Sequence, residues 1–190
     1  DTVARKLMRV NVSDILCKGA LPSEALLSVA LPEDFSESDF EAFCKGLGDE
    51  LEKWECTLLG GDTVSTPGPL TLSLTLTGVC HESGPVLRSG ASNGDVLAVT
   101  GSIGHGSLGL DDARAGRASR HADHYRVPQL APLAFAALVA RYATASIDVS
   151  DGLISDAGHL ARQSRHQIHI ALNEDPFAVE PGDVNEALRL

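Results

Sequence analysis

Three short acidic motifs contain the residues of this chain that are best suited to chemistry. They are Asn-Val-Ser-Asp at residues 11–14, Gly-Gly-Asp-Thr at residues 60–63 and Ile-Asp-Val-Ser-Asp-Gly at residues 147–152. Each lies where a strand-like run gives way to a loop or helix. Carboxylates at strand ends often bind hard cations, and Mg²⁺ usually bridges one or two carboxylates to substrate phosphates. Together the motifs indicate a magnesium-phosphate site and favour nucleotide-dependent phosphoryl transfer.

The third motif places two carboxylates three residues apart. Asp148 and Asp151 can point toward one cation from a strand end and the first turn of a helix, while Ser150 offers a hydroxyl and nearby amides face an anion. Alternatively, Ser150 or Asp151 only caps the following helix, because Ser and Asp are preferred at that position. The spacing alone does not separate these alternatives.

The other two motifs also have structural alternatives. Glycine has no β-carbon and accepts positive φ, so Gly60 and Gly61 permit the close approach of a ligand, with Asp62 at the rim. An ordinary tight turn has the same composition. Asp14 follows a strand-like run at residues 8–12, and by itself it is typical of an acid at a helix start. The motifs gain weight together, because open α/β sheets bind ligands at the carboxyl ends of strands.

Few other residues compete for a chemical role. Arg88 is either a solvated surface charge or a clamp on nucleotide phosphate. The glycine-containing run at residues 101–106 resembles a dinucleotide loop only loosely and lacks its acidic ribose partner, which argues against a Rossmann fold. Only His121 and His124 approach the spacing of metal ligands. No serine or cysteine nucleophile with a histidine base is evident, which favours direct transfer without a covalent intermediate.

These motifs must be positioned by an α/β (α+β) fold with two lobes. The expected helices cover residues 13–18, 36–54, 132–143 and 155–163, and the expected strands cover residues 8–12, 26–31, 57–59, 70–79, 96–100 and 145–149. Residues 111–123 are charged and predict a mobile surface segment. A polar, glycine-containing stretch at residues 81–85 predicts a boundary between lobes at 1–84 and 85–190.

Composition excludes several classes of protein. A formal charge of −11 argues against binding the nucleic-acid backbone, which requires clustered Lys and Arg. No apolar run approaches the roughly 20 residues that span a bilayer, so no membrane association is expected. The 4 cysteines are scattered singly, which predicts buried thiols in a reducing cytoplasm rather than disulfides or a zinc site.

Taken in order, the motifs of the chain resemble those of the thiamine-monophosphate kinase family, within the wider group of aminoimidazole-ribonucleotide synthetase-like ATP-binding proteins. The resemblance runs through essentially all 190 residues. Its further pieces are Lys18-Gly19-Ala20, Arg88-Ser89-Gly90, Gly94-Asp95, Val99-Thr100-Gly101 and Leu153 after the third acidic motif.

The resemblance implies an ATP- and Mg²⁺-dependent enzyme that phosphorylates thiamine monophosphate to thiamine diphosphate. It implies a homodimer whose amino-terminal sheets join in a barrel, with residues 1–84 binding ATP and metal and residues 85–190 forming a carboxyl-terminal α/β domain. Carried over by position, the metal ligands are Asp14, Asp62, Asp148 and Asp151, of which Asp14, Asp148 and Asp151 serve catalysis, and the ATP contacts are Gly61, Asp62, Arg88 and Ser150.

The resemblance also has departures and rivals. The family's amino-terminal strand and its carboxyl-terminal Gly-Gly-Glu-Asp-Tyr-Glu-like segment have no counterpart here, so the chain is expected to be a fragment. The first rival is a sister enzyme, either a hydrogenase-maturation dehydratase or a ribonucleotide cyclo-ligase. The second is a non-catalytic, nucleotide-binding dimerisation module.

Overall fold

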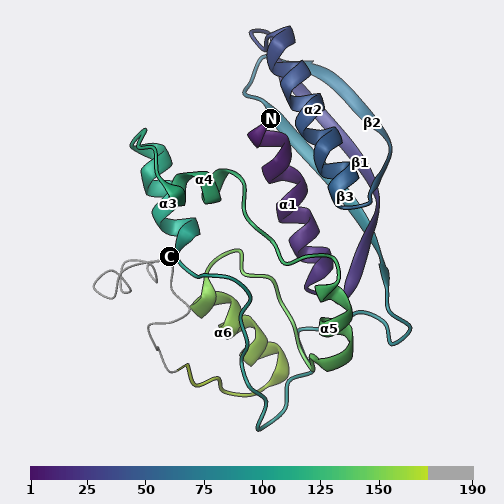
Figure 1. Cartoon of the computed structure of the whole chain (residues 1–190), viewed down its shortest axis with the longest axis vertical. Coiled ribbons are helices and arrows are strands. Elements are labelled where there is room, and N and C mark those ends of the chain that lie inside the picture. Colours follow the sequence, from purple (N-terminus) through teal and green to yellow (C-terminus); the bar gives the residue numbers. More distant parts are fainter. Residues whose placement is uncertain (171–190) are drawn as a thin grey trace.

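A three-stranded mixed sheet with two long helices on one face forms the larger part of the molecule (Figure 1). The computed structural model describes residues 1–170. The helices are α1 (Thr2–Leu16), α2 (Glu37–Lys53), α3 (His105–Arg114), α4 (Arg120–Arg126), α5 (Phe135–Tyr142) and α6 (Leu153–Ser164), and the strands are β1 (Ala20–Pro32), β2 (Thr57–Thr66) and β3 (Thr71–Cys80). The expected mixture of helices and strands in an α/β fold is confirmed.

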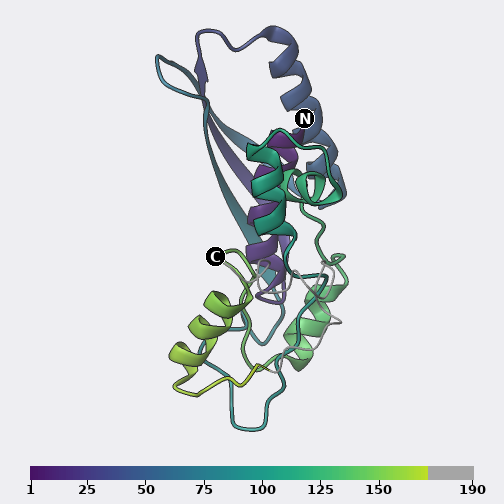
Figure 2. The same cartoon turned by 90° about the vertical axis from the view of Figure 1, so that its left-hand side faces the viewer.

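The central strand β1 separates a buried face of the sheet from an exposed one. It pairs in parallel with β2 and antiparallel with β3. Ala25, Leu27 and Val29 alternate with exposed residues and are buried in the core formed with α1 and α2. Because alternate residues of a strand point to opposite faces, the intervening residues lie on the face without helices. In Figure 2 the sheet lies on one side, and helices α1 and α2 lie together on the other side of it.

Helix α1 replaces the strand that was expected at residues 8–12. Ala4, Met8 and Val12 are 0% exposed, and Leu16 continues the same row. Residues four apart lie on one face of a helix, so this row packs as a helical stripe. Valine is typical of strands, which made this segment look like one. The buried side chains instead recur every four residues, as they do in a helix.

Helix α2 forms as the sequence indicates. Ser36 accepts a hydrogen bond from the Asp39 amide at 3.1 Å and so caps the helix, and Glu37 lies in the first turn. Phe43 and Leu47 face the core.

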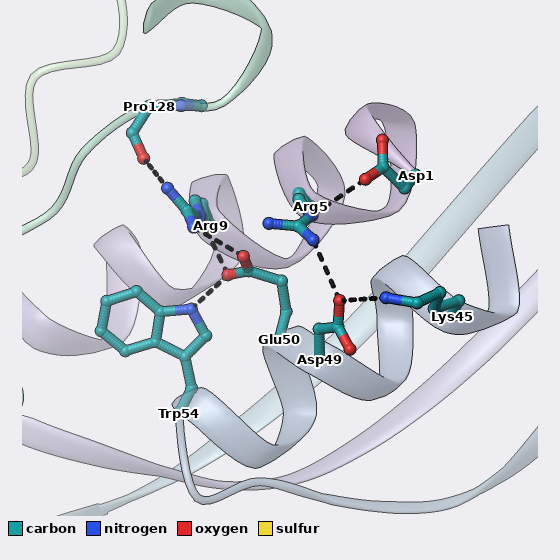
Figure 3. A network of polar contacts seen from close by, with 8 residues as sticks. All are labelled: Asp1, Arg5, Arg9, Lys45, Asp49, Glu50, Trp54 and Pro128. Carbon is teal, nitrogen blue, oxygen red and sulfur yellow. Dashed lines mark hydrogen bonds and ion pairs between the residues drawn. The ribbon is translucent and has the colours of Figure 1, made fainter. Parts of the chain in front are cut away.

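A buried polar network joins α2 to α1, and Figure 3 shows its members. Glu50 accepts two hydrogen bonds from Arg9, at 2.6 and 2.9 Å, and one from the Trp54 indole at 2.7 Å. Arg9 also donates to the Pro128 carbonyl at 2.9 Å, which ties the loop before α5 to the two helices. Burial tends to raise the pKa of Glu50, but the hydrogen bonds from Arg9 and Trp54 and the Arg9 charge outweigh it, and the pKa is lowered.

Several other expectations about elements need correction. Residues 60–63 do not end a strand, because β2 continues through them to Thr66. Residues 96–100 and 145–149 are not strands. Residues 111–123 include the end of α3 and the start of α4 rather than a mobile segment. The expected strand at 70–79 and the helix at 155–163 are confirmed within one or two residues. The expected strand at 26–31 is confirmed but begins six residues earlier, at Ala20, and the expected 132–143 helix is shorter.

The four cysteines are all free, as expected, but only Cys56 is buried. Cys44 and Cys80 are exposed, and Cys17 is partly buried, so the expectation of buried thiols was wrong for most of them. Among residues 1–170, no helix is both long and apolar enough to cross a membrane.

Candidate functional site

Two of the predicted site residues, Asp14 and Asp148, meet where α1 ends. Asp14 lies in the last turn of α1 and is exposed, so the alternative that it starts a helix was wrong. An acid near the carboxyl end of a helix interacts unfavourably with the helix dipole, so Asp14 is not placed there for helix stability. The Asp148 carboxyl approaches it from the segment before α6, close enough for each charge to act on the other.

The contact between the two carboxyls changes the titration of Asp148. Burial and the negative charge of Asp14 together raise the pKa of Asp148 to about 6. Two carboxylates side by side resist joint ionisation unless a cation lies between them or a proton is shared. The pair is therefore a place where a bound cation relieves repulsion.

Cys17 and Lys18 complete the end of α1 at this site. Burial raises the pKa of the Cys17 thiol; the Lys18 charge opposes the rise, and the charges of Asp148 and Asp14 add to it. Cys17 thus stays a neutral thiol beside the carboxyl pair. Lys18 donates a hydrogen bond from Nζ to the Ser146 carbonyl at 2.8 Å, which ties the end of α1 to the segment that carries Asp148.

An open hollow begins at Lys18, just beyond the end of α1 where the carboxyl pair lies, and carries two cationic side chains. It has a volume of about 380 Å³ and is lined by Lys18, Leu87, Arg88, Ser89 and Gln163. Ser164 of α6 donates to the Arg88 carbonyl at 2.9 Å and accepts from the Ala91 amide at 3.1 Å, so it holds the Arg88 loop against α6. Although the chain is acidic as a whole, two cationic residues, Lys18 and Arg88, line this hollow. Such an arrangement suits a bound anion.

The loop at residues 148–152 has its backbone amides already occupied. The amides of Ser150, Asp151 and Gly152 donate to one oxygen, Oδ2 of Asp156, at 3.0, 3.1 and 3.1 Å. Asp156 is only 3% exposed. The expectation that amides near Ser150 face an external anion was therefore wrong for these three. Gly152 is the residue just before α6, so neither Ser150 nor Asp151 caps that helix. Both side chains remain exposed.

Asp62 and Gly61 lie elsewhere in this chain. In the register of the sheet, Asp62 pairs with Ser28 and Gly61 with Leu27. Leu27 points into the core and Ser28 away from it, so Asp62 is on the helix-free face of the sheet, opposite the face that α1 covers. The Asp62 carboxylate accepts a hydrogen bond from the Thr63 amide at 2.9 Å. Within one chain, the sheet separates Asp62 from Asp14.

The glycine pair in β2 has a structural reason. The register of β1 and β2 shifts at Ala25/Leu26, so that Leu59 is skipped and Gly60 adopts a φ of 155°. This is a β-bulge, which strand pairs accommodate most easily with glycine. A methyl group at Gly61 would overlap the Leu27 carbonyl oxygen, so close approach of the two strands requires glycine there.

The carboxylates of Asp14 and Asp148 are a better match for Mg²⁺ than for a metal ion whose ligands all come from the protein. No group of three or more His, Cys, Asp or Glu side chains in the described part of the chain is arranged to hold a metal ion. Mg²⁺ does not require such a cage, because it usually takes one or two carboxylates, several waters and substrate phosphates. The Asp14–Asp148 pair beside a cationic hollow matches that need, with Asp151 on the same loop as Asp148.

Reasoning from the sequence missed Asp156, Lys18 and Ser164 as residues that build the site. Asp156 carries a weak local signal, since it follows Asp151 by five residues inside the predicted helix, but nothing in the sequence shows that its side chain turns back to the loop. The contacts of Lys18 with Ser146 and of Ser164 with Arg88 join residues more than 70 positions apart, which no local pattern reveals.

Comparison with known proteins places the chain beside one enzyme family. Residues 1–80 match the family model of the AIR synthase related protein, N-terminal domain. The thiamine-monophosphate kinase of Caulobacter vibrioides is 37% identical over 185 residues, which is 94% of this chain and 51% of that protein. The chain thus spans about half the length of this relative. The expected resemblance is confirmed.

Solved structures share the fold. A structure described as "AaThiL complexed with AMPPCP and TMP" is 33% identical, with a TM-score of 0.80 over 86% of this chain and 54% of that one. A crystal structure of the hydrogenase maturation protein HypE is 19% identical, with a TM-score of 0.71 over 85% of this chain and 52% of that one. At that lower identity the similarity shows the fold alone.

Proposed function

We propose that this chain, a homologue of the thiamine-monophosphate kinases, is part of a protein that uses ATP and Mg²⁺ to phosphorylate thiamine monophosphate to thiamine diphosphate. The observation that carries the proposal is the Asp14–Asp148 carboxyl pair next to the hollow lined by Lys18 and Arg88. A relative of 33% identity has been solved with AMPPCP and TMP, which supports the choice of both substrates.

The residues of the site divide into two groups by charge. Asp14, Asp148 and Asp151 hold Mg²⁺, which when bound neutralises charge on the triphosphate. Arg88 and Lys18 fix phosphate oxygens across the hollow, and the exposed hydroxyl of Ser150 adds a contact to ATP. The chain supplies no covalent nucleophile in this scheme. It orients the two phosphates so that an oxygen of thiamine monophosphate attacks the terminal phosphorus of ATP in line and ADP leaves.

A homodimer is part of the proposal, because the helix-free face of the sheet carries exposed apolar side chains. On this face we place Leu26 and Val64, which are 48% and 51% exposed and share it with Asp62. Pairing two such faces would bury them and would form the interior of a barrel. Asp62 and Gly61 then contact metal and ATP in the dimer rather than in one isolated chain.

The remaining expectations concern organisation. We keep the division into an ATP- and metal-binding, dimerising domain at residues 1–84 and a carboxyl-terminal α/β domain at residues 85–190. The free cysteines support a reducing compartment, and we propose the cytoplasm.

A sister enzyme is the second candidate, and the shared fold with the hydrogenase maturation protein HypE favours keeping it. Such an enzyme would keep the ATP site and change the acceptor. The higher identity to thiamine-monophosphate kinases, 37% against 19%, favours the kinase.

The decisive experiment follows thiamine diphosphate from the protein incubated with ATP, Mg²⁺ and thiamine monophosphate. Asp14→Asn and Asp148→Asn should each lower kcat by about a hundredfold or more, because each removes a charge that holds the cation. EDTA should abolish nucleotide binding, since the carboxylates then face the triphosphate without a cation.

The matched control is Asp112→Asn. Asp112 accepts hydrogen bonds from Ser119 and Arg117 at the turn between α3 and α4, so its loss should leave kcat within twofold. Unchanged turnover in both Asp14→Asn and Asp148→Asn would refute the site. ATP binding without any product would favour a non-catalytic module.

A further inference from the structure

Asp156 occupies the place that a bound anion would take in the loop before α6. Three successive backbone N–H groups, those of Ser150, Asp151 and Gly152, converge on its Oδ2 at 3.0–3.1 Å. Successive amides that point to one spot form a concave anion-binding nest, which in many proteins accepts phosphate. Here the nest is filled from within by a carboxylate that is 3% exposed.

The packing of α6 holds this carboxylate in place. The backbone amide of Asp156 donates to the Gly152 carbonyl at 2.9 Å. Asp156 thus both accepts hydrogen bonds from the loop and donates one back to it. Leu153 and Ala157 on either side are buried and fix that helical face against the rest of the molecule. The Asp156 charge also acts on Asp148, the first carboxylate of the loop.

We propose that Asp156 is a positioning residue that makes this loop a cation site: by taking the amides of residues 150–152, it leaves the carboxylates of Asp148 and Asp151 and the Ser150 hydroxyl to meet a ligand. The inference rests on the proposed function, in which those carboxylates hold Mg²⁺. It adds that the amides of residues 150–152 make no direct contact with nucleotide phosphate. Phosphate approaches the carboxylates of Asp148 and Asp151 only through a divalent cation, because the bare carboxylates repel it.

The test compares Asp156→Ala, which removes the acceptor, with Asp156→Asn, which retains one oxygen at the accepting position. Amide hydrogen exchange of residues 150–152 is followed by NMR without any ligand, well below the unfolding midpoint of each variant. In Asp156→Ala these amides should exchange at least about tenfold faster, and the Mg²⁺ concentration for half-maximal nucleotide binding should rise by about 10–100-fold. In Asp156→Asn both the amide exchange rate and the Mg²⁺ requirement should stay close to those of the wild type.

Asp112→Ala is the matched control, since it removes another carboxylate that organises a turn next to a helix. Asp112→Ala should lower the unfolding midpoint but leave the Mg²⁺ requirement for nucleotide binding within about twofold. If Asp156 had a purely structural role, Asp156→Ala would also lower the unfolding midpoint and leave the Mg²⁺ requirement unchanged. The inference is overturned by that pattern, by an Asn variant as impaired as the Ala variant, or by ATP in EDTA shifting the wild-type amides of residues 150–152.

The two proposals can fail separately. Exchange of the three amides is measured without substrate, and the Mg²⁺ requirement is read from nucleotide binding rather than from turnover. One such outcome is that Asp156→Ala shows both faster amide exchange and a higher Mg²⁺ requirement while the wild type does not phosphorylate thiamine monophosphate. That result would refute thiamine monophosphate as the acceptor and support the positioning role of Asp156.

Discussion

Two buried or half-buried acids of this chain show how partners decide the chemistry of a carboxylate. Glu50 accepts three hydrogen bonds from Arg9 and Trp54, and its pKa is lowered. Asp148 instead faces Asp14, and burial and that neighbour raise its pKa to about 6. The first arrangement is complete within the protein. The second would be completed by the Mg²⁺ that we propose, which is why we assign function to Asp148 and structure to Glu50.

Replacing Glu50 therefore tests the structural role directly. Glu50→Ala leaves the Arg9 guanidinium buried without its counter-charge, so we expect a loss of about 3–5 kcal/mol in the free energy of unfolding. Asp49→Ala is the neighbouring control, because Asp49 forms exposed ion pairs with Arg5 and Lys45 and should cost less than about 1 kcal/mol. Urea unfolding measures both. Equal losses for the two variants would show that the buried network contributes no more than a surface pair.

Among the elements, the α3–α4 pair has a stability that should depend on pH. His105 of α3 stacks on His124 of α4 with ring centroids 4.3 Å apart, and its Nδ1 lies 3.0 Å from Nδ1 of His121. Burial, then the charges of His124, His121 and Arg120, lower the pKa of His105 to about 4. Burial and His121 also lower the pKa of His124. His105 and His124 therefore pack as neutral rings.

The unfolded chain binds more protons at His105 than the folded one between the ordinary pKa of about 6.5 and about 4, and the lowered pKa of His124 acts in the same direction. Their contribution to stability is thus complete above about pH 6.5 and is lost as the pH falls toward 4. The raised pKa of Asp148 makes its contribution to stability change with pH in the opposite direction. The pH dependence of a variant must therefore be compared with that of the wild type. Urea unfolding of His105→Asn between about pH 7.5 and 5 should show a smaller loss on acidification than wild type.

His81→Asn serves as the control for the histidine cluster. His81 is exposed and lies outside α3 and α4, so this variant should keep the wild-type dependence on pH. A His105 variant that loses stability on acidification as steeply as wild type would contradict the interpretation.

For the whole molecule, the unequal covering of the sheet has the largest consequence. Helices α1 and α2 cover one face, as Figure 2 shows, while the other face carries Leu26, Val64 and Asp62. Leu26 and Val64 lie on neighbouring strands of this face, and we propose that a second copy of the chain covers them. The proposed dimer would cover this face and would also decide whether Asp62 reaches a metal.

A charge on the central strand should prevent that association. Leu26→Glu places a carboxylate in the middle of the proposed interface, and we expect the dimer to weaken by about 2 kcal/mol or more, which sedimentation velocity detects as a shift to monomer. Leu138→Glu on α5 is the control, since Leu138 is 50% exposed but belongs to a helix and not to the helix-free face of the sheet, and it should not change the association. A wild-type protein that remains monomeric at high concentration would refute the dimer.

The sequence by itself determined the local features of this protein. Ser36 and the acids after it predicted the start of α2, and alternation predicted β3. The acidic motifs led to the prediction that Asp14 and Asp148 are site residues, and the two carboxyls do lie close enough to affect each other. These conclusions depend on interactions between residues a few positions apart, which a pattern along the chain records. The same logic failed for residues 8–12 and 60–63, where packing against other elements outweighed local preference.

Only the tertiary structure decided which of these residues meet. The carboxyls of Asp14 and Asp148 come from segments more than 100 positions apart, and the sheet register separates Asp62 from both of them. It also decided that Asp156, inside a helix, fills the amides of the preceding loop. The physical reason is that pKa shifts, buried hydrogen bonds and the face on which a side chain lies all depend on distance in space, and no local period along the chain encodes that distance.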